Sequence, residues 1–156
     1  MLRRFSPMLL VVCLFLLTSG CAVNRATAIS TSGTDLSKVK SFYIIEVQAD
    51  KDTWKVYKLI ETNLTKRGYA VTTGPEVKSP EKSDVILTYV DKWMWDLSNY
   101  MLHLTITFKE PTSNLTMARG HSFHTSLTRK SAEEMVDEVL TNVFKTKSTG
   151  EEVRYE

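Results

Sequence analysis

The sequence of 156 residues contains few cysteines, few histidines, few glycines and no apolar segment long enough to cross a membrane as a helix. Its two cysteines, Cys13 and Cys21, both precede the part that is predicted to fold. A disulfide framework and a cysteine-ligated metal site are therefore excluded for a folded domain. Arg3 and Arg4 account for the whole excess of basic over acidic residues, so the chain after Cys21 has no net charge. This balance, together with the lack of a Gly-rich phosphate loop, argues against a nucleic-acid partner.

The longest apolar run covers residues 8–17 and follows the basic pair Arg3 and Arg4. A transmembrane helix needs roughly 20 apolar residues, whereas the apolar part of a secretory signal has about 7–15. Residues 1–20 are therefore predicted to be a signal peptide that is removed on export.

A run of small residues leads directly into Cys21, since residues 17–21 read Leu-Thr-Ser-Gly-Cys. This segment resembles the lipobox of bacterial lipoproteins, although Thr18 stands where that motif usually has leucine and Leu17 lies one step earlier. The resemblance implies that Cys21 is the lipid attachment site and the first residue of the mature chain. The alternative is ordinary signal-peptidase cleavage after the small-x-small sequence at residues 26–28, which would release a soluble periplasmic protein.

The lipid at Cys21 determines the expected location of the protein. Several acyl chains anchor far more firmly than one chain, which gives only marginal membrane binding. Ala22 rather than Asp follows the cysteine, and in lipoproteins of this kind a non-acidic residue there implies transfer to the outer membrane. We therefore expect a lipid anchor on the periplasmic face of the outer membrane. Residues 21–37 are rich in Ser, Thr and Ala without apolar periodicity, and they are predicted to form the lipidated cysteine and a flexible tether.

One α+β domain is predicted for residues 38–147, followed by a polar tail over residues 148–156. The expected order is β-α-β-β-β-β-α, with a four- to five-stranded, mainly antiparallel sheet and two amphipathic helices on one face. Period-two and β-branched patterns predict strands over residues 41–47, 69–72, 85–95, 100–108 and 115–125. Apolar residues at helical spacing predict helices over residues 53–67 and 131–145.

Local signals mark the ends of both helices and one face of the central hairpin. Asp52 or Thr53 is a candidate N-cap for the first helix, and Gly68 supplies its left-handed end. Ser131 and Glu134 have the spacing of a capping box for the second helix. Alternation along the fourth strand predicts that one set of side chains faces the core: Tyr100, Leu102, Leu104, Ile106 and Phe108.

The three histidines, His103, His121 and His124, are the first candidates for chemistry. His121 and His124 lie three apart on one strand, so they face opposite sides and cannot chelate one metal without a bulge. His103 could lie across from His121, but two imidazoles without a third ligand make a weak zinc site. Ser122 lacks the Gly-x-Ser-x-Gly turn of a nucleophile. We therefore predict no metal, no cofactor and no catalytic residue.

Trp93 and Trp95 form the densest aromatic cluster and share one strand face. They belong either to the core or to an exposed platform for a glycan, lipid or protein partner. The general burial of aromatic side chains favours the core.

Three features together carry a family resemblance: the Gly-Tyr-Ala-Val sequence that follows the first helix, the Ser-Asp-Val-Ile-Leu sequence that enters the next strand, and the lipobox. The chain resembles small bacterial outer-membrane lipoproteins whose β-α-β-meander-α domain has no assigned activity. The resemblance covers most of residues 36–147 and carries over no catalytic residue. A more distant similarity of layout is to the lipoprotein partner of the lipopolysaccharide-assembly translocon.

These observations lead to a functional expectation. The protein is expected to be a non-enzymatic scaffold or accessory subunit of an envelope complex, with a protein or glycolipid partner. Four residues are the candidate partner-binding set: Trp93, Trp95, His103 and His121. The alternative is a periplasmic ligand-binding module that uses the aromatic face of Trp93 and Trp95.

Overall fold

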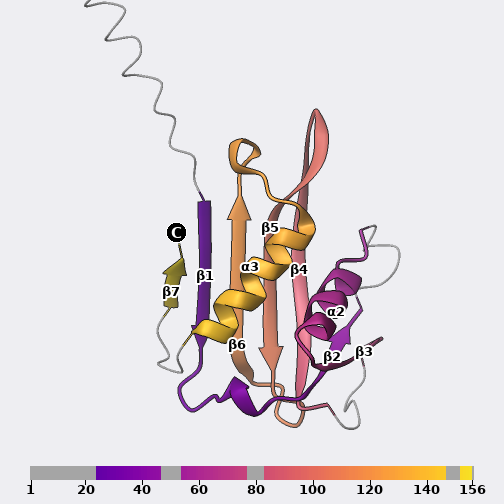
Figure 1. The fold of residues 1–156 in the computed structure, drawn as a ribbon, viewed down its shortest axis with the longest axis vertical. Coiled ribbons are helices and arrows are strands. Elements are labelled where there is room, and N and C mark those ends of the chain that lie inside the picture. Colours follow the sequence, from indigo (N-terminus) through magenta and orange to yellow (C-terminus); the bar gives the residue numbers. More distant parts are fainter. Residues whose placement is uncertain (1–23, 47–53, 77–82, 147–151, 156) are drawn as a thin grey trace, which may run out of the picture.

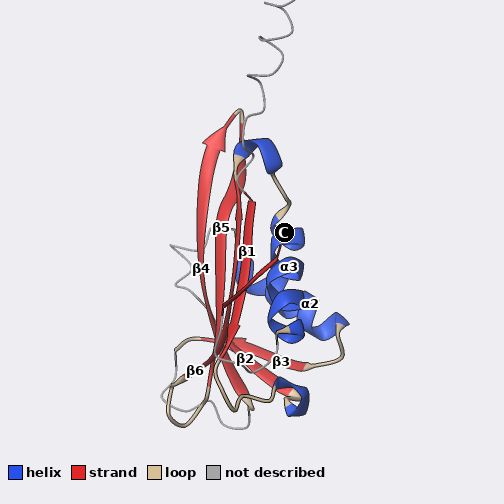
Figure 2. Ribbon diagram, turned by 90° about the vertical axis from the view of Figure 1, so that its left-hand side faces the viewer, coloured by secondary structure: helices blue, strands red, loops and turns tan. Residues whose placement is uncertain are grey.

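One mixed β-sheet organises the residues that the computed structural model describes, which are 24–46, 54–76, 83–146 and 152–155. The sheet has seven strands in the order β3-β2-β4-β5-β6-β1-β7, and two helices lie against one of its faces (Figures 1 and 2). The strands are β1 (Asn24–Ser30), β2 (Ser41–Ile45), β3 (Ala70–Gly74), β4 (Val85–Asp96), β5 (Ser98–Lys109), β6 (Thr116–His124) and β7 (Glu152–Tyr155). The helices are α2 (Val56–Lys66) and α3 (Ala132–Lys145).

The α+β class and the antiparallel-dominated sheet are confirmed, because only β2 pairs in parallel, with β3 and with β4. The predicted strand number of four to five is too low. The two additional strands lie where a tether and a polar tail were expected, since β1 covers residues 24–30 and β7 covers residues 152–155. The predicted signal peptide, residues 1–20, and Cys21 lie outside the described residues. Neither described helix is long and apolar enough to cross a bilayer.

The small residues of β1 allow helix α3 to pack closely on this strand. Ala26, Ala28 and Ser30 are buried on the helix-facing side, and Ala28 pairs with Gly120 of β6. A Cβ atom on Gly120 would lie 2.6 Å from a methyl carbon of Val143 in α3. The helix therefore packs so closely on β1 and β6 that only small side chains fit beneath it. The same small residues made the segment look like a flexible linker, and that prediction is wrong for residues 24–30.

The helix ends follow most of the predicted signals. Helix α3 begins with the predicted capping box, in which Ser131 and Glu134 each bind the other's backbone N–H. Gly68 has φ +91° after the end of α2, as its sequence position predicts. Helix α2 starts later than expected: its N-cap is Lys55, which has φ 50° and no side-chain cap. The expected caps, Asp52 and Thr53, lie outside the described residues.

A β-bulge interrupts the long hairpin of β4 and β5. Lys92 pairs with His103, whereas the next residue, Trp93, pairs with Met101. The extra residue on β5 is therefore Leu102, and the inward face shifts by one position beyond it. Leu104, Ile106 and Phe108 are buried as predicted. Beyond the bulge Met101 is the buried residue, whereas Leu102 and Tyr100, which were predicted to face the core, are only half-buried.

Among the described residues no helix lies on the second face of the sheet, because α2 and α3 lie on the same side (Figure 2). Arg67, at the end of α2, joins the two helices on the covered face. Its guanidinium donates to Asp137 of α3 at 2.8 Å and to Thr141 of α3 at 2.6 Å. The two ends of the sheet also differ (Figure 1). The start of β1, the β4–β5 hairpin and the β6–α3 connection share one end, and the β5–β6 turn lies at the opposite end.

Candidate functional site

Two histidines meet on the uncovered face of the sheet, on strands β5 and β6. Thr105 pairs directly with His121, and His103 precedes Thr105 by two positions, so the two imidazoles are diagonal neighbours. Their ring centroids are 4.3 Å apart. The Thr105 hydroxyl lies 2.8 Å from His103 Nε2 and 3.3 Å from His121 Nδ1. The structure therefore brings together the two histidines that the sequence placed in the partner-binding set, with Thr105 holding both rings.

A shallow hollow of about 380 Å³ surrounds this pair. Its remaining lining comes from β1 and β6 and comprises Arg25, Thr27, Ile29 and Arg119. Arg25 and Arg119 are exposed. Burial, and secondarily the positive charge of Lys92, lower the pKa of His103 below its ordinary value. The hollow thus combines a neutral imidazole with two guanidinium groups, an arrangement that favours polar or anionic groups.

Two metal-ligating side chains, His103 and His121, line this hollow. Within the described ranges, no group of three or more His, Cys, Asp or Glu side chains is placed to hold a metal ion. A histidine pair without a third ligand does not satisfy the usual zinc coordination.

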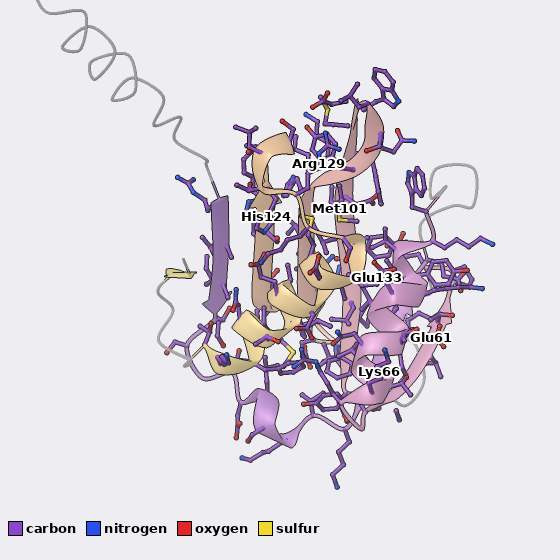
Figure 3. The ribbon with its side chains drawn as sticks, turned by 45° about the horizontal axis from the view of Figure 1, so that its top comes forward. Glu61, Lys66, Met101, His124, Arg129 and Glu133 are labelled. Atoms are coloured by element: carbon purple, nitrogen blue, oxygen red, sulfur yellow. The ribbon has the colours of Figure 1, made fainter. Side chains whose placement is uncertain are left out.

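His124 lies on the other face of the sheet, beneath α3 (Figure 3), so the predicted divergence of His121 and His124 is confirmed. There Ser122 Oγ donates to Glu138 Oε2 at 2.6 Å, and His124 Nε2 lies 2.8 Å from the same oxygen. Lys130 binds the second oxygen of Glu138. Burial alone would raise the pKa of Glu138, but hydrogen bonds from Lys130, Ser122 and His124 hold it below its usual range.

The Ser122, His124 and Glu138 side chains do not have the order of a catalytic triad. The Ser122 hydroxyl donates its hydrogen bond to the Glu138 carboxylate rather than to the His124 imidazole, and Ser122 is fully buried. A nucleophile needs a base at its hydroxyl and access for substrate. The network instead ties β6 to α3. Sequence analysis missed it because Glu138 lies 16 residues from Ser122, on a different element. The sequence did place Ser122 and His124 two residues apart on one strand, so it could have shown that their side chains share a face.

The two tryptophans have different surroundings. Trp93 is half-buried, its ring stacks on Trp54 with 4.5 Å between centroids, and its indole N–H donates to Asp91 at 2.6 Å. Trp95 is 71% exposed. The expectation that both tryptophans belong to the core is therefore wrong for Trp95. They also do not form one open platform, because Trp54 covers a face of the Trp93 ring.

Exposed apolar side chains lie at the end of the molecule beyond Trp95, beside the polar residues Asp96, Ser98 and Arg129. Leu97 connects β4 to β5 with φ 60° and is 92% exposed, and Leu127 is 80% exposed in the 3₁₀ turn η2 (Ser126–Thr128). Few non-glycine residues adopt a positive φ, so this tight turn directs Leu97 outward. The sequence did not predict this apolar tip, because the polar residues around Leu97 indicated an ordinary exposed turn.

Arg129 connects the two parts of this end (Figure 3). Its guanidinium donates to Asp96 Oδ2 at 3.0 Å and to Ser98 Oγ at 2.9 Å, and it lies 4.4 Å from the ring centroid of Tyr100. The loop that carries Leu127 is thereby held against the β4–β5 hairpin.

Comparisons with known proteins identify the fold only. No protein-family model and no curated protein matches the sequence. Among solved structures, the fold is similar to that of the PelC dodecamer from Paraburkholderia phytofirmans, with a TM-score of 0.59 and 11% identity, over 80% of this chain and 100% of that one. A single-substitution variant of that dodecamer gives a TM-score of 0.55 at 10% identity, over 80% and 99% of the two chains.

Proposed function

We propose that this protein is an envelope lipoprotein, anchored through Cys21 to the periplasmic face of the outer membrane, that acts as a non-enzymatic scaffold or accessory subunit. Its partner would bind the uncovered sheet face around His103 and His121. The observation that carries the proposal is the asymmetry of the sheet: two helices cover one face, whereas the other presents a polar hollow rimmed by Arg25 and Arg119.

The composition of this face supports a reversible protein contact. The imidazoles and threonines offer hydrogen-bond donors and acceptors, and the two arginines offer charge-assisted bonds to carboxylates or phosphates. Such polar, charge-complementary surfaces give specificity and rapid association. An acidic segment of an envelope protein, or the phosphate groups of an envelope glycolipid, has the matching chemistry.

The solved structures with a similar fold support a role as a subunit. Both are dodecamers, so domains of this architecture do assemble into larger complexes. The identity of 10–11% carries over no interface residue. We propose the same general behaviour for this chain, as one component of an assembly.

A second candidate function is ligand binding near Trp93 and Trp95, which the exposure of Trp95 favours. A hollow of about 280 Å³ lies beside Trp93 and is also lined by Tyr100 and Arg129. An aromatic ring beside a guanidinium would suit a glycan or a phosphorylated headgroup. Loss of ligand binding in a folded Trp95→Ala variant would favour this candidate over the scaffold.

A photo-crosslinker placed on each face tests the scaffold proposal. One chain carries the crosslinking amino acid in place of Val90, which pairs with Thr105 on the uncovered face and is 65% exposed. A matched chain carries it in place of Glu133, an exposed position on α3 (Figure 3). We expect a discrete crosslinked product in intact cells from the first position and none from the second. Equal products from both faces, or no product from Val90, would contradict a partner-binding sheet face.

The anchor is tested separately by intact mass and membrane fractionation of the wild type beside Cys21→Ser. We expect acyl mass and membrane association in the wild type only. Two soluble proteins that begin near Ile29 would instead support a diffusible periplasmic protein. Since β1 begins at Asn24, cleavage there would also remove most of a sheet strand.

A further inference from the structure

The distance between the lipid site and the folded domain is short. Strand β1 begins at Asn24, three residues after Cys21. A chain of three residues spans at most about 10 Å. Acyl chains on Cys21 therefore hold the start of β1 close to the bilayer, and no long tether lets the domain stand away from it.

The β4–β5 hairpin projects from the same end of the sheet (Figure 1). The pairing of Arg25 with Phe123, and of Phe123 with His103, sets these three residues in one row across the sheet. His103 pairs with Lys92, and from Lys92 strand β4 continues for four more residues to Asp96, its last residue. At about 3.3 Å per residue, this extension is about 13 Å. The four residues from Arg25 back to Cys21 span at most about 14 Å, so the hairpin tip reaches about as far toward the anchored side as that segment allows.

The side chains at this end suit a membrane surface. Trp95, Leu97 and Leu127 are the most exposed large apolar side chains of the described residues, and Met94 adds to them from the same hairpin. Tryptophan is enriched at membrane–water interfaces, where its ring lies at headgroup level. Arg129 joins the Leu127 loop to the hairpin, so these side chains are presented by one rigid end.

We infer that this apolar end, defined by Met94, Trp95, Leu97 and Leu127, is a second membrane contact that inserts into the headgroup region of the bilayer that holds the Cys21 lipid. The inference rests on the lipidation of Cys21 in the proposed function. The acyl chains supply the attachment, and the hairpin tip sets the orientation. In this orientation the strands stand on the membrane, and the uncovered sheet face is turned sideways toward partners on the same surface.

Tryptophan quenching in vesicles tests this orientation. The full lipoprotein is reconstituted in phosphatidylethanolamine–phosphatidylglycerol vesicles with ordinary or brominated acyl chains, which quench indoles at the membrane. The chain has three tryptophans. Trp93 lies two residues before Trp95 on β4, but it is half-buried and stacks on Trp54, whereas Trp95 is 71% exposed. We expect brominated lipid to quench part of the wild-type emission, and we expect Trp95→Phe to remove that quenched component.

A charge substitution with a matched control separates the tip from the rest of the surface. Leu97→Glu is expected to abolish the quenching of Trp95. Leu115→Glu is expected to leave it unchanged, because Leu115 is also exposed, at 68%, but lies in the β5–β6 turn at the opposite end. Circular dichroism confirms that both variants are folded.

The outcomes distinguish this inference from the anchor on which it rests. Intact mass of the vesicle-bound protein reports whether Cys21 carries acyl chains. If the acyl mass is present and brominated lipid leaves Trp95 unquenched, the second membrane contact is wrong while the anchor stands. Shielding of Trp95 that depends on protein concentration rather than on lipid would identify a second copy as the occupant and would overturn the membrane contact. Absence of the acyl mass would refute the anchor itself.

Discussion

Replacing Glu138 by alanine is predicted to cost more stability than any comparable change at a helix surface of this protein. The carboxylate accepts hydrogen bonds from the buried Ser122 hydroxyl and from Lys130, and it contacts the buried His124 imidazole. A hydrogen bond to a charged group contributes about 1.5–3 kcal/mol, and an orphaned buried polar group costs about 1–3 kcal/mol. Removing one partner of a buried ion pair typically costs 3–5 kcal/mol. We therefore expect Glu138→Ala to lower the unfolding free energy by about 3–5 kcal/mol.

Urea denaturation followed by far-UV circular dichroism measures this loss. The midpoint should fall while the slope of free energy against urea stays constant, because the surface exposed on unfolding hardly changes. Glu133→Ala is the matched control on the same helix, since Glu133 is exposed and in the first turn. Its removal should cost at most about 1 kcal/mol. A loss below about 1 kcal/mol for Glu138→Ala would refute the stabilising role of the network.

The same carboxylate predicts a pH dependence. Its folded-state pKa is lowered, so its contribution is fully present above its unfolded pKa of about 4.3 and is lost as the pH falls through the folded value. The stability difference between wild type and Glu138→Gln should therefore shrink below about pH 4.3. A difference that stays constant from pH 7 to pH 3 would contradict this assignment.

Three further predictions concern other parts of the fold. Gly120→Ala should lower the unfolding free energy by about 1–3 kcal/mol in the same urea assay, because its methyl group would collide with Val143; an unchanged midpoint would contradict the close approach of α3. The His103 imidazole should titrate below its ordinary pKa in an NMR titration, and Lys92→Ala should move that pKa upward, because one source of positive charge is removed; no change on removing Lys92 would contradict the electrostatic contribution. Arg129→Ala should make the amide hydrogens at the end of the β4–β5 hairpin, beyond the bulge, exchange faster, because it removes the link to the loop before α3, whereas the rest of β4 and β5 keeps its protection; unchanged exchange at the hairpin end would refute that link.

Much of the domain was predictable because its signals are local. The capping box at Ser131 follows from spacing within one turn, and the left-handed Gly68 follows from its position after a helical pattern. The alternation from Leu104 to Phe108 identified a core face directly.

The remaining features depend on contacts between distant segments, which local patterns do not encode. The small residues of β1 resemble a linker until α3 is known to pack on them. Leu102 fits the alternation of its own strand, but the bulge is set by the pairing with β4. The Glu138 network joins a helix to a strand, so neither segment reveals it alone.

The candidate site was identified in part. His103 and His121 do meet, but the contribution of Arg25 could not be predicted, because β1 was interpreted as a tether. The exposed end with Leu97 and Leu127 was missed because its two parts lie thirty residues apart in the sequence and meet through Arg129. The general burial of aromatic side chains favoured the core for Trp95. Trp95 is exposed instead, because it lies near the end of the long β4–β5 hairpin.

The place of β1 in the sheet has a consequence for how the chain acquires its structure. Its first residue, Asn24, pairs with His124, so β1, which is synthesised before every other described strand, can pair only after β6 is available. Contacts between residues so far apart in the sequence form slowly, because the entropy of closing a large loop is lost before the pairing stabilises the chain. Until then β6 presents an unpaired edge, which is prone to pair with other chains. Synthesis of β1 and its incorporation into the sheet are thus separated in time, and the interval between them is when a chaperone would matter most.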